Sequence, residues 1–81
     1  MYYIYMLRSE SNPEKTYIGF TKDLKTRLSA HNLGQSPYTS KFNPWDLITY
    51  IAFNNRQKTL DFEKYLKSHS GKAFAKKRLW A

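Results

Sequence analysis

The chain has 81 residues, no cysteine and a formal net charge of +8. At this length we expect one domain over residues 1–81 with a small core. The lack of cysteine excludes a disulfide framework, a Cys-based zinc site and a thiol nucleophile, and it suits a reducing compartment, so we expect a cytoplasmic protein. The longest uncharged apolar run, Tyr2 to Leu7, is far shorter than the roughly 20 residues of a membrane span.

The positive charge is concentrated toward the C-terminus. From Arg56 onward eight basic residues accompany only two acidic ones, Asp61 and Glu63, a local net charge of +6. This surplus favours a nucleic-acid partner over a merely soluble surface, because cations bind phosphates. The run Lys76-Lys77-Arg78 beside Trp80 suits contact with a phosphate and a base, although cations also stabilise the C-terminus of a helix.

The first half of the chain predicts a β-hairpin followed by a helix. The segment Tyr2 to Leu7 is aromatic and β-branched, hence a strand, and its nearly continuous apolar character places it in mid-sheet. Thr16 to Phe20 is the second strand of an antiparallel pair. A helix is expected over about Lys22 to Leu33, with Thr21 as its N-cap and Gly34 as its C-terminal stop.

The second half predicts one strand and two helices. Gln35 to Pro44 has the composition of a loop, and Trp45 to Phe53 that of a third strand. Asn55 is expected to cap a helix from about Arg56 to Lys67. A short last helix is expected over Lys72 to Arg78, after a break at Ser70-Gly71. Three side chains of the earlier helix are expected to point inward together: Phe62, Tyr65 and Leu66.

The predicted order of elements is β-β-α-β-α-α. Short strands and helices in this order make an α+β fold, with a three-stranded, mainly antiparallel sheet flanked by helices.

Five polar side chains could surround one phosphate in such a fold. Tyr5 and Tyr17 lie on adjacent strands, Arg27 and His31 are four residues apart on the first helix, and Glu63 lies between core positions of the second. Phosphodiester hydrolysis needs activation of water, charge stabilisation and help for the leaving oxygen. Glu63 could hold a hard divalent cation, Arg27 could bind the phosphate oxygens as a fork, and a tyrosine with a lowered pKa could accept the proton of water.

Each of these residues also has a plain structural interpretation. The tyrosines suit a sheet, Arg27 suits an exposed helix face and His31 suits a helix end. Glu63 and Lys67 have the spacing of an ordinary i,i+4 ion pair.

Two tripeptides and three single residues resemble the signature of the GIY-YIG nuclease superfamily. Tyr3-Ile4-Tyr5 corresponds to the first tripeptide, with Tyr in place of Gly, and Tyr17-Ile18-Gly19 matches the second. Arg27 and His31 have the family's spacing, and Phe62-Glu63-Lys64 resembles the helix with its metal-binding glutamate. The chain is similar to the small single-domain bacterial members and to the catalytic domain of the excision-repair incision subunit.

The resemblance implies a metal-dependent endonuclease that acts on DNA. Tyr5 would be the general base or would orient the water, and Tyr17 would contact the phosphate or the metal's water shell and could share the base role. Arg27 would stabilise the scissile phosphate, and His31 would assist Tyr5 or contact the phosphate. Glu63 would bind one Mg²⁺ or Mn²⁺ ion.

Gly19 has a further interpretation in its backbone. Without a Cβ, the strand at this residue can approach the active-site face closely or form a bulge.

Binding would rest on further cations, with DNA as the expected ligand, RNA left open and no membrane expected. Specificity would come from DNA structure, from a protein partner or from self-association, and the oligomeric state stays open. Two alternatives to an enzyme are a non-catalytic nucleic-acid binding module and a small interaction subunit of a DNA-processing complex. The loop Tyr38 to Lys41, with Trp45, either touches a substrate strand or packs as an ordinary loop. The candidate nucleic-acid contacts are Lys22, Lys41, Lys72, Lys76, Lys77 and Arg78.

Overall fold

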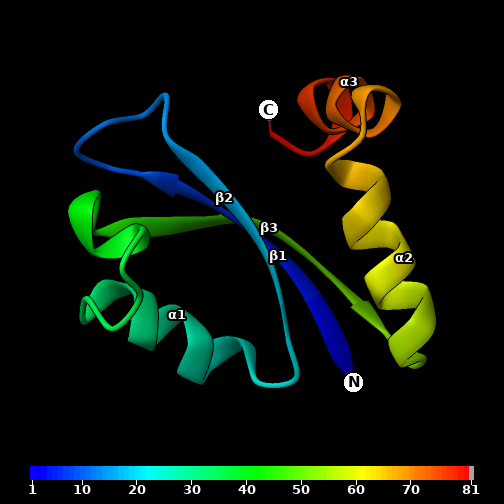
Figure 1. The fold of residues 1–81 in the computed structure, drawn as a ribbon, viewed down its shortest axis with the longest axis horizontal. Helices are drawn as coiled ribbons and strands as arrows, with labels where there is room; N and C mark the ends of the chain where they lie inside the picture. Colours follow the sequence, from blue (N-terminus) through cyan, green and yellow to red (C-terminus); the bar gives the residue numbers. More distant parts are fainter. Residues whose placement is uncertain (81) are drawn as a thin grey trace.

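The computed structural model describes residues 1–80, and its helices and strands follow one another in the predicted order (Figure 1). The elements are β1 (Tyr2–Ser9), β2 (Thr16–Thr21), α1 (Leu24–Asn32), the 3₁₀ turn η1 (Thr39–Lys41), β3 (Trp45–Phe53), α2 (Arg56–Leu66) and α3 (His69–Arg78). The predicted α+β class, order and antiparallel sheet are confirmed. Within the described residues, none of the helices combines the length and apolar character needed to cross a bilayer.

The sheet has β1 in the middle, with β2 and β3 antiparallel on either side. Four consecutive β1 side chains, Ile4 to Leu7, are buried, which confirms the prediction of a central strand covered on both faces. The register sets Tyr5 opposite Gly19 of β2 and Tyr50 of β3. This pairing determines which side chains of β2 lie beside Tyr5.

Each face of the sheet has its own small core, because successive strand side chains alternate between faces. Tyr5, Leu7 and Trp45 form the buried cluster on the side of α1, while Ile4 and Met6 join residues of α2 and α3 on the other side. Figure 1 shows α1 and the α2–α3 pair on opposite sides of the twisted sheet. The candidate active-site tyrosines therefore face α1.

The start of α1 differs from the expectation. The N-cap is Asp23, whose Oδ1 accepts from the Thr26 N–H at 3.1 Å, so the helix begins at Leu24. The expected cap, Thr21, instead closes the preceding turn, where its Oγ1 accepts from the Asp23 N–H at 3.1 Å. An Asp two residues later competes for the same role, and its carboxylate also suits the positive end of the helix.

The end of α1 is as expected. Gly34 has a φ of +75° and follows the C-cap, and its N–H donates to the His31 carbonyl at 3.2 Å. The Gln35 N–H donates to the Ala30 carbonyl at 3.1 Å, which completes the paired bonds of a Schellman motif. This motif orders the last turn of α1, where His31 lies.

The last helix begins three residues earlier than expected, at His69. Ser68 is its cap and accepts from the Gly71 N–H at 3.1 Å, so Gly71 lies inside the helix and does not break it. A Cβ at Gly71 would clash with the Tyr65 carbonyl, so glycine allows α3 to pack closely on the end of α2.

The expectation that Tyr65 points inward is wrong. Its side chain is 40% exposed and lies against Phe74 of α3, with ring centroids 6.1 Å apart. The inward face of α2 contains Thr59 and Leu66, both fully buried, and Tyr65 is rotated off that stripe.

Candidate active site

The centre of the site is a contact between Tyr5 of β1 and His31 in the last turn of α1. The Tyr5 Oη lies 2.9 Å from His31 Nε2, and both side chains are only 2% exposed. The Schellman motif after α1 and the central position of β1 place both groups on well-ordered elements. A phenol and an imidazole in this contact can exchange a proton directly.

A second contact holds the other ring nitrogen of His31. His31 Nδ1 lies 2.8 Å from Thr39 Oγ1 in η1, and Thr39 is fully buried. The indole N–H of Trp45 donates to the Thr39 carbonyl at 2.8 Å. Thr39 and Trp45 are therefore packed residues, as the structural interpretation of this loop predicted. The sequence offers no signal for the role of Thr39, because the contact depends on how the loop folds back onto α1.

Two residues of β2, Tyr17 and Gly19, lie beside the Tyr5 side chain. The half-buried Tyr17 has its ring centroid 5.0 Å from that of His31 and 6.0 Å from that of Tyr38, which is 47% exposed. Gly19 lies opposite Tyr5, and a Cβ there would clash with the Tyr5 phenol ring. Glycine at this position thus gives the Tyr5 hydroxyl its room.

Arg27 and Glu63 approach the same centre from different helices. Arg27 is exposed on α1, four residues before His31, and its charge acts on both Tyr5 and His31. Glu63 lies half-buried on α2, and its charge also acts on Tyr5. Its carboxylate accepts from Lys67 Nζ at 3.0 Å, which is the i,i+4 pair expected from the spacing. Of the other four candidate residues, His31 and Tyr17 contact Tyr5, and the charges of Arg27 and Glu63 act on it.

The surroundings move the pKa values of Tyr5 and His31 apart. Burial, followed by the nearby Tyr17, raises the pKa of Tyr5 well above its usual value. Burial, followed by the Arg27 charge, lowers the pKa of His31. At neutral pH Tyr5 is a neutral phenol and His31 a neutral imidazole. Arg27 lowers the pKa of Tyr5, as expected of a nearby cation, but burial outweighs this effect.

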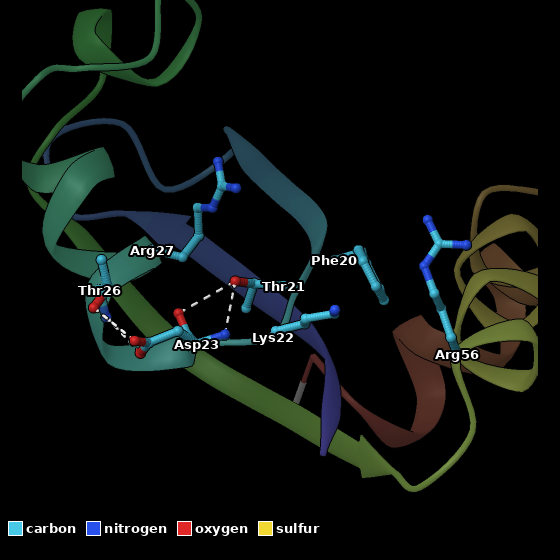
Figure 2. A pocket seen from close by; sticks show the side chains of 7 residues that line it. All are labelled: Phe20, Thr21, Lys22, Asp23, Thr26, Arg27 and Arg56. Carbon is cyan, nitrogen blue, oxygen red and sulfur yellow. Dashed lines mark hydrogen bonds between the residues drawn. The ribbon is translucent and has the colours of Figure 1, made fainter.

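A hollow of about 510 Å³ opens beside Arg27, at the edge of β2 (Figure 2). Figure 2 shows Arg27 of α1 on one side and Arg56, the first residue of α2, on the other. Lys22 lies between them and extends toward Phe20. In the sequence, Arg56 stands out only as one of the basic residues of the C-terminal part. This hollow is called the β2-edge hollow below, and its lining is Phe20, Thr21, Lys22, Asp23, Thr26, Arg27 and Arg56.

The remaining basic candidates do not gather at one place. Lys22 lines the β2-edge hollow, and Lys41 is exposed at the end of η1. The other four lie exposed on α3, which packs on α2: Lys72, Lys76, Lys77 and Arg78.

Trp80 does not extend from the basic run as a free aromatic side chain. It is partly buried against the core cluster of Ile4 and Met6. The Arg8 guanidinium lies over its ring at 5.5 Å and donates to its carbonyl at 3.1 Å. The suggested contact of Trp80 with a base has no support from this packing.

The order of the elements and the residues around Tyr5 are those expected of a GIY-YIG nuclease domain. The family model described as the GIY-YIG catalytic domain matches residues 1–78, and the chain belongs to this family. The predicted resemblance and the predicted enzyme type, a GIY-YIG endonuclease, are confirmed.

The relatives fall into two groups. A UPF0213 protein of Haloquadratum walsbyi is 31% identical over 70 residues, covering 85% of this chain and 76% of its own length. A UPF0213 protein of Streptococcus agalactiae serotype V is 35% identical, covering 88% of this chain and 80% of its own length. The structure-specific endonuclease subunit SLX1 of Candida dubliniensis is 38% identical over 72 residues, which are 80% of this chain and 25% of that protein. The chain thus spans most of the UPF0213 proteins and about a quarter of this SLX1 subunit.

Proposed function

We propose that residues 1–81 act as one metal-dependent endonuclease domain that hydrolyses phosphodiester bonds in DNA, and that it does so in the cytoplasm. The observation that supports this best is the buried contact of Tyr5 Oη with His31 Nε2, with the ring of Tyr17 beside it and the charges of Arg27 and Glu63 acting on Tyr5. Any buried phenol needs a hydrogen-bond partner. An imidazole in that place also gives Tyr5 a base that can take up its proton.

Tyr5 and His31 move the proton of the attacking water. Since Tyr5 is a neutral phenol and His31 a neutral imidazole, Tyr5 Oη accepts the water proton while its own proton passes to His31 Nε2. This requires the tautomer in which His31 Nδ1–H donates to Thr39 Oγ1, so Thr39 positions His31. Both ring nitrogens of His31 already have protein partners, Tyr5 Oη and Thr39 Oγ1, which favours this assisting role over direct contact with the phosphate.

Arg27 and Tyr17 hold the phosphate. The exposed guanidinium of Arg27 presents a fork of N–H donors that matches two phosphate oxygens. The half-buried Tyr17 lies between Tyr5 and the exposed Tyr38, where its hydroxyl contacts the phosphate or water.

The donor set fits one Mg²⁺ or Mn²⁺ ion. GIY-YIG nucleases generally use divalent metal ions. Residues 1–80 contain no group of three His, Cys, Asp or Glu side chains that could hold a metal by themselves. A lone carboxylate beside a phosphate site nevertheless suits Mg²⁺, which is often bound by one or two carboxylates, substrate oxygens and waters. Glu63 would hold the ion, displacing an ion pair with Lys67 that is worth little. When bound, the ion would polarise the phosphate and ease departure of the leaving oxygen.

Substrate choice belongs to the same proposal. The SLX1 relatives are named as subunits of a structure-specific endonuclease. By analogy, we propose that branched or flapped DNA is the substrate and that a protein partner contributes specificity. The four cations on α3 would add nonspecific contacts with the DNA backbone.

The test is cleavage of supercoiled, branched and flapped DNA with Mg²⁺ or Mn²⁺, against EDTA. Cleavage that requires the ion and is lost in Arg27→Ala and in Glu63→Gln supports the proposal. Asp61→Asn is the matched control. Asp61 is an exposed acid on the same helix as Glu63, and among residues 1–80 its carboxylate accepts only from Gln57 of that helix. Salt-sensitive DNA binding without cleavage of any substrate would contradict the proposed nuclease activity and would favour a non-catalytic binding module. DNA affinity that does not change with salt would favour an interaction subunit.

A further inference from the structure

We propose that the β2-edge hollow is a second phosphate subsite, in which Arg56 and Lys22 hold a backbone phosphate of the substrate strand near the scissile one. The proposal rests on the proposed function. It assigns to Arg56 a role in binding the nucleic acid that is separate from the chemistry at Tyr5 and Arg27.

The first support is the position of the hollow. It crosses the edge of β2 between α1 and the start of α2, so Arg27 forms one wall and Arg56 the other (Figure 2). Lys22, in the turn after β2, adds a third cation between them. A strand whose scissile phosphate lies at Arg27 therefore has a cationic surface directly beside it.

The second support is that these cations have no carboxylate partner. The single ion pair among residues 1–80 joins Lys67 and Glu63. Asp23 also lines the hollow, but both of its carboxylate oxygens accept from Thr26, at 3.1 and 2.9 Å. The charges of Lys22, Arg27 and Arg56 are thus available to an anion.

The third support is that Arg56 lies where a cation does not help the helix. It is the first residue of α2, and the first turn of α2 contains no acidic residue. A cation at a helix N-terminus is unfavourable, because the helix dipole is positive at that end. Its guanidinium lies over the Phe20 ring at 5.8 Å, and this contact directs the side chain toward β2 and the hollow.

The fourth support is that Arg56 lies on the same face of α2 as Glu63. Arg56 and Glu63 are seven residues apart, so they share a face of α2 and are separated by about 10.5 Å along its axis. A strand of B-DNA advances about 3.4 Å along the duplex axis per nucleotide and also winds around that axis, so this separation spans at most about three nucleotides. The subsite should therefore hold a phosphate within about three nucleotides of the cleaved bond.

The first experiment measures binding of a flapped DNA duplex in EDTA over a range of salt concentrations. Arg56→Ala should weaken binding about tenfold and reduce the slope of log affinity against log salt by about 1. Lys58→Ala removes a charge from the same turn of α2, outside the hollow, and should change neither. Arg56→Lys should keep the slope. In metal, Arg56→Ala should raise KM and leave kcat unchanged. Equal effects of Arg56→Ala and Lys58→Ala would overturn the subsite.

The second experiment locates the phosphate. Single methylphosphonates, which remove one backbone charge, are placed in turn along the cleaved strand. One position within about three nucleotides of the cut should weaken binding of the wild type and have no further effect in Arg56→Ala. Additive losses at every position would overturn the subsite. Its failure is distinct from failure of the proposed function, since binding is measured in EDTA and cleavage separately in metal.

Discussion

Tyr5 and His31 are 26 residues apart in the chain, yet the Tyr5 hydroxyl lies 2.9 Å from His31 Nε2 inside the protein. The contact joins the central strand of the sheet to the last turn of α1. Because burial raises the pKa of Tyr5 and lowers that of His31, the two groups are both neutral over a wide range around neutral pH.

The pH profile of kcat should follow from this pair. Activity needs neutral His31, whose pKa lies below its ordinary value, so the acid limb should fall below about pH 6.5. With the pKa of Tyr5 raised, kcat should not increase from pH 7 to 9 through formation of a tyrosinate. Tyr5→Phe should lower kcat at least a hundredfold, in keeping with the loss of a general base. A rise in kcat at alkaline pH would contradict the proposal that Tyr5 reacts as a neutral phenol.

Stability should change with pH in the same acid range. The folded pKa of His31 is lower than the unfolded one, so the unfolded state binds more protons below about pH 6.5. The free energy of unfolding should therefore decrease as the pH falls through that region, by up to about 1.4 kcal/mol per pH unit. Urea titrations at several pH values measure this. The decrease should be smaller in His31→Gln than in the wild type. It should equal that of the wild type in His69→Gln, because His69 is exposed.

Thr39 should act on the reaction through His31. Thr39→Val removes the partner of His31 Nδ1 and keeps the shape of the side chain, so it leaves a buried polar group unpaired at about 1–3 kcal/mol of stability. We expect kcat to fall with little change in KM and the acid limb of the pH profile to move. Thr39→Ser keeps the hydroxyl and should restore both. A loss of stability without any shift in the pH profile would mean that Thr39 is only structural.

Gly19 should be intolerant of a side chain. Gly19→Ala places a methyl group against the Tyr5 ring, and overpacking of this kind typically destabilises by about 1–3 kcal/mol. The smaller side chain in Tyr5→Leu should relieve part of that effect, so the two changes should be non-additive in urea denaturation. Gly34→Ala is the contrasting case, since it strains the backbone at φ +75° without touching Tyr5. It should be additive with Tyr5→Leu.

The hairpin, the central strand and the polar pattern around Tyr5 could be predicted from the sequence, because local propensity and the order of elements determine them. The N-cap of α1 could not, since Thr21 and Asp23 both suit that role and only the geometry of the turn chooses between them. Helix α3 was predicted too short because glycine usually ends a helix, whereas Gly71 serves close packing on Tyr65.

Within the site, the candidate residues could be named only through the resemblance to the family signature. Thr39 and Arg56 could not, because each acts through a contact across the fold, to His31 in one case and to Phe20 in the other. Their single positions have no periodicity or motif that separates them from an ordinary loop threonine and an ordinary helix cation.

Tyr5 belongs to the same buried cluster as Leu7 and Trp45. The group proposed to accept the proton is therefore also part of what keeps the sheet and α1 together. A cleavage-deficient protein for trapping a complex with DNA is better built as Glu63→Gln, which leaves both the interior and the phosphate-holding Arg27 intact. For the same reason, truncation of Tyr5 to alanine would reduce protein yield as well as turnover, and loss of activity in that variant would say little about chemistry.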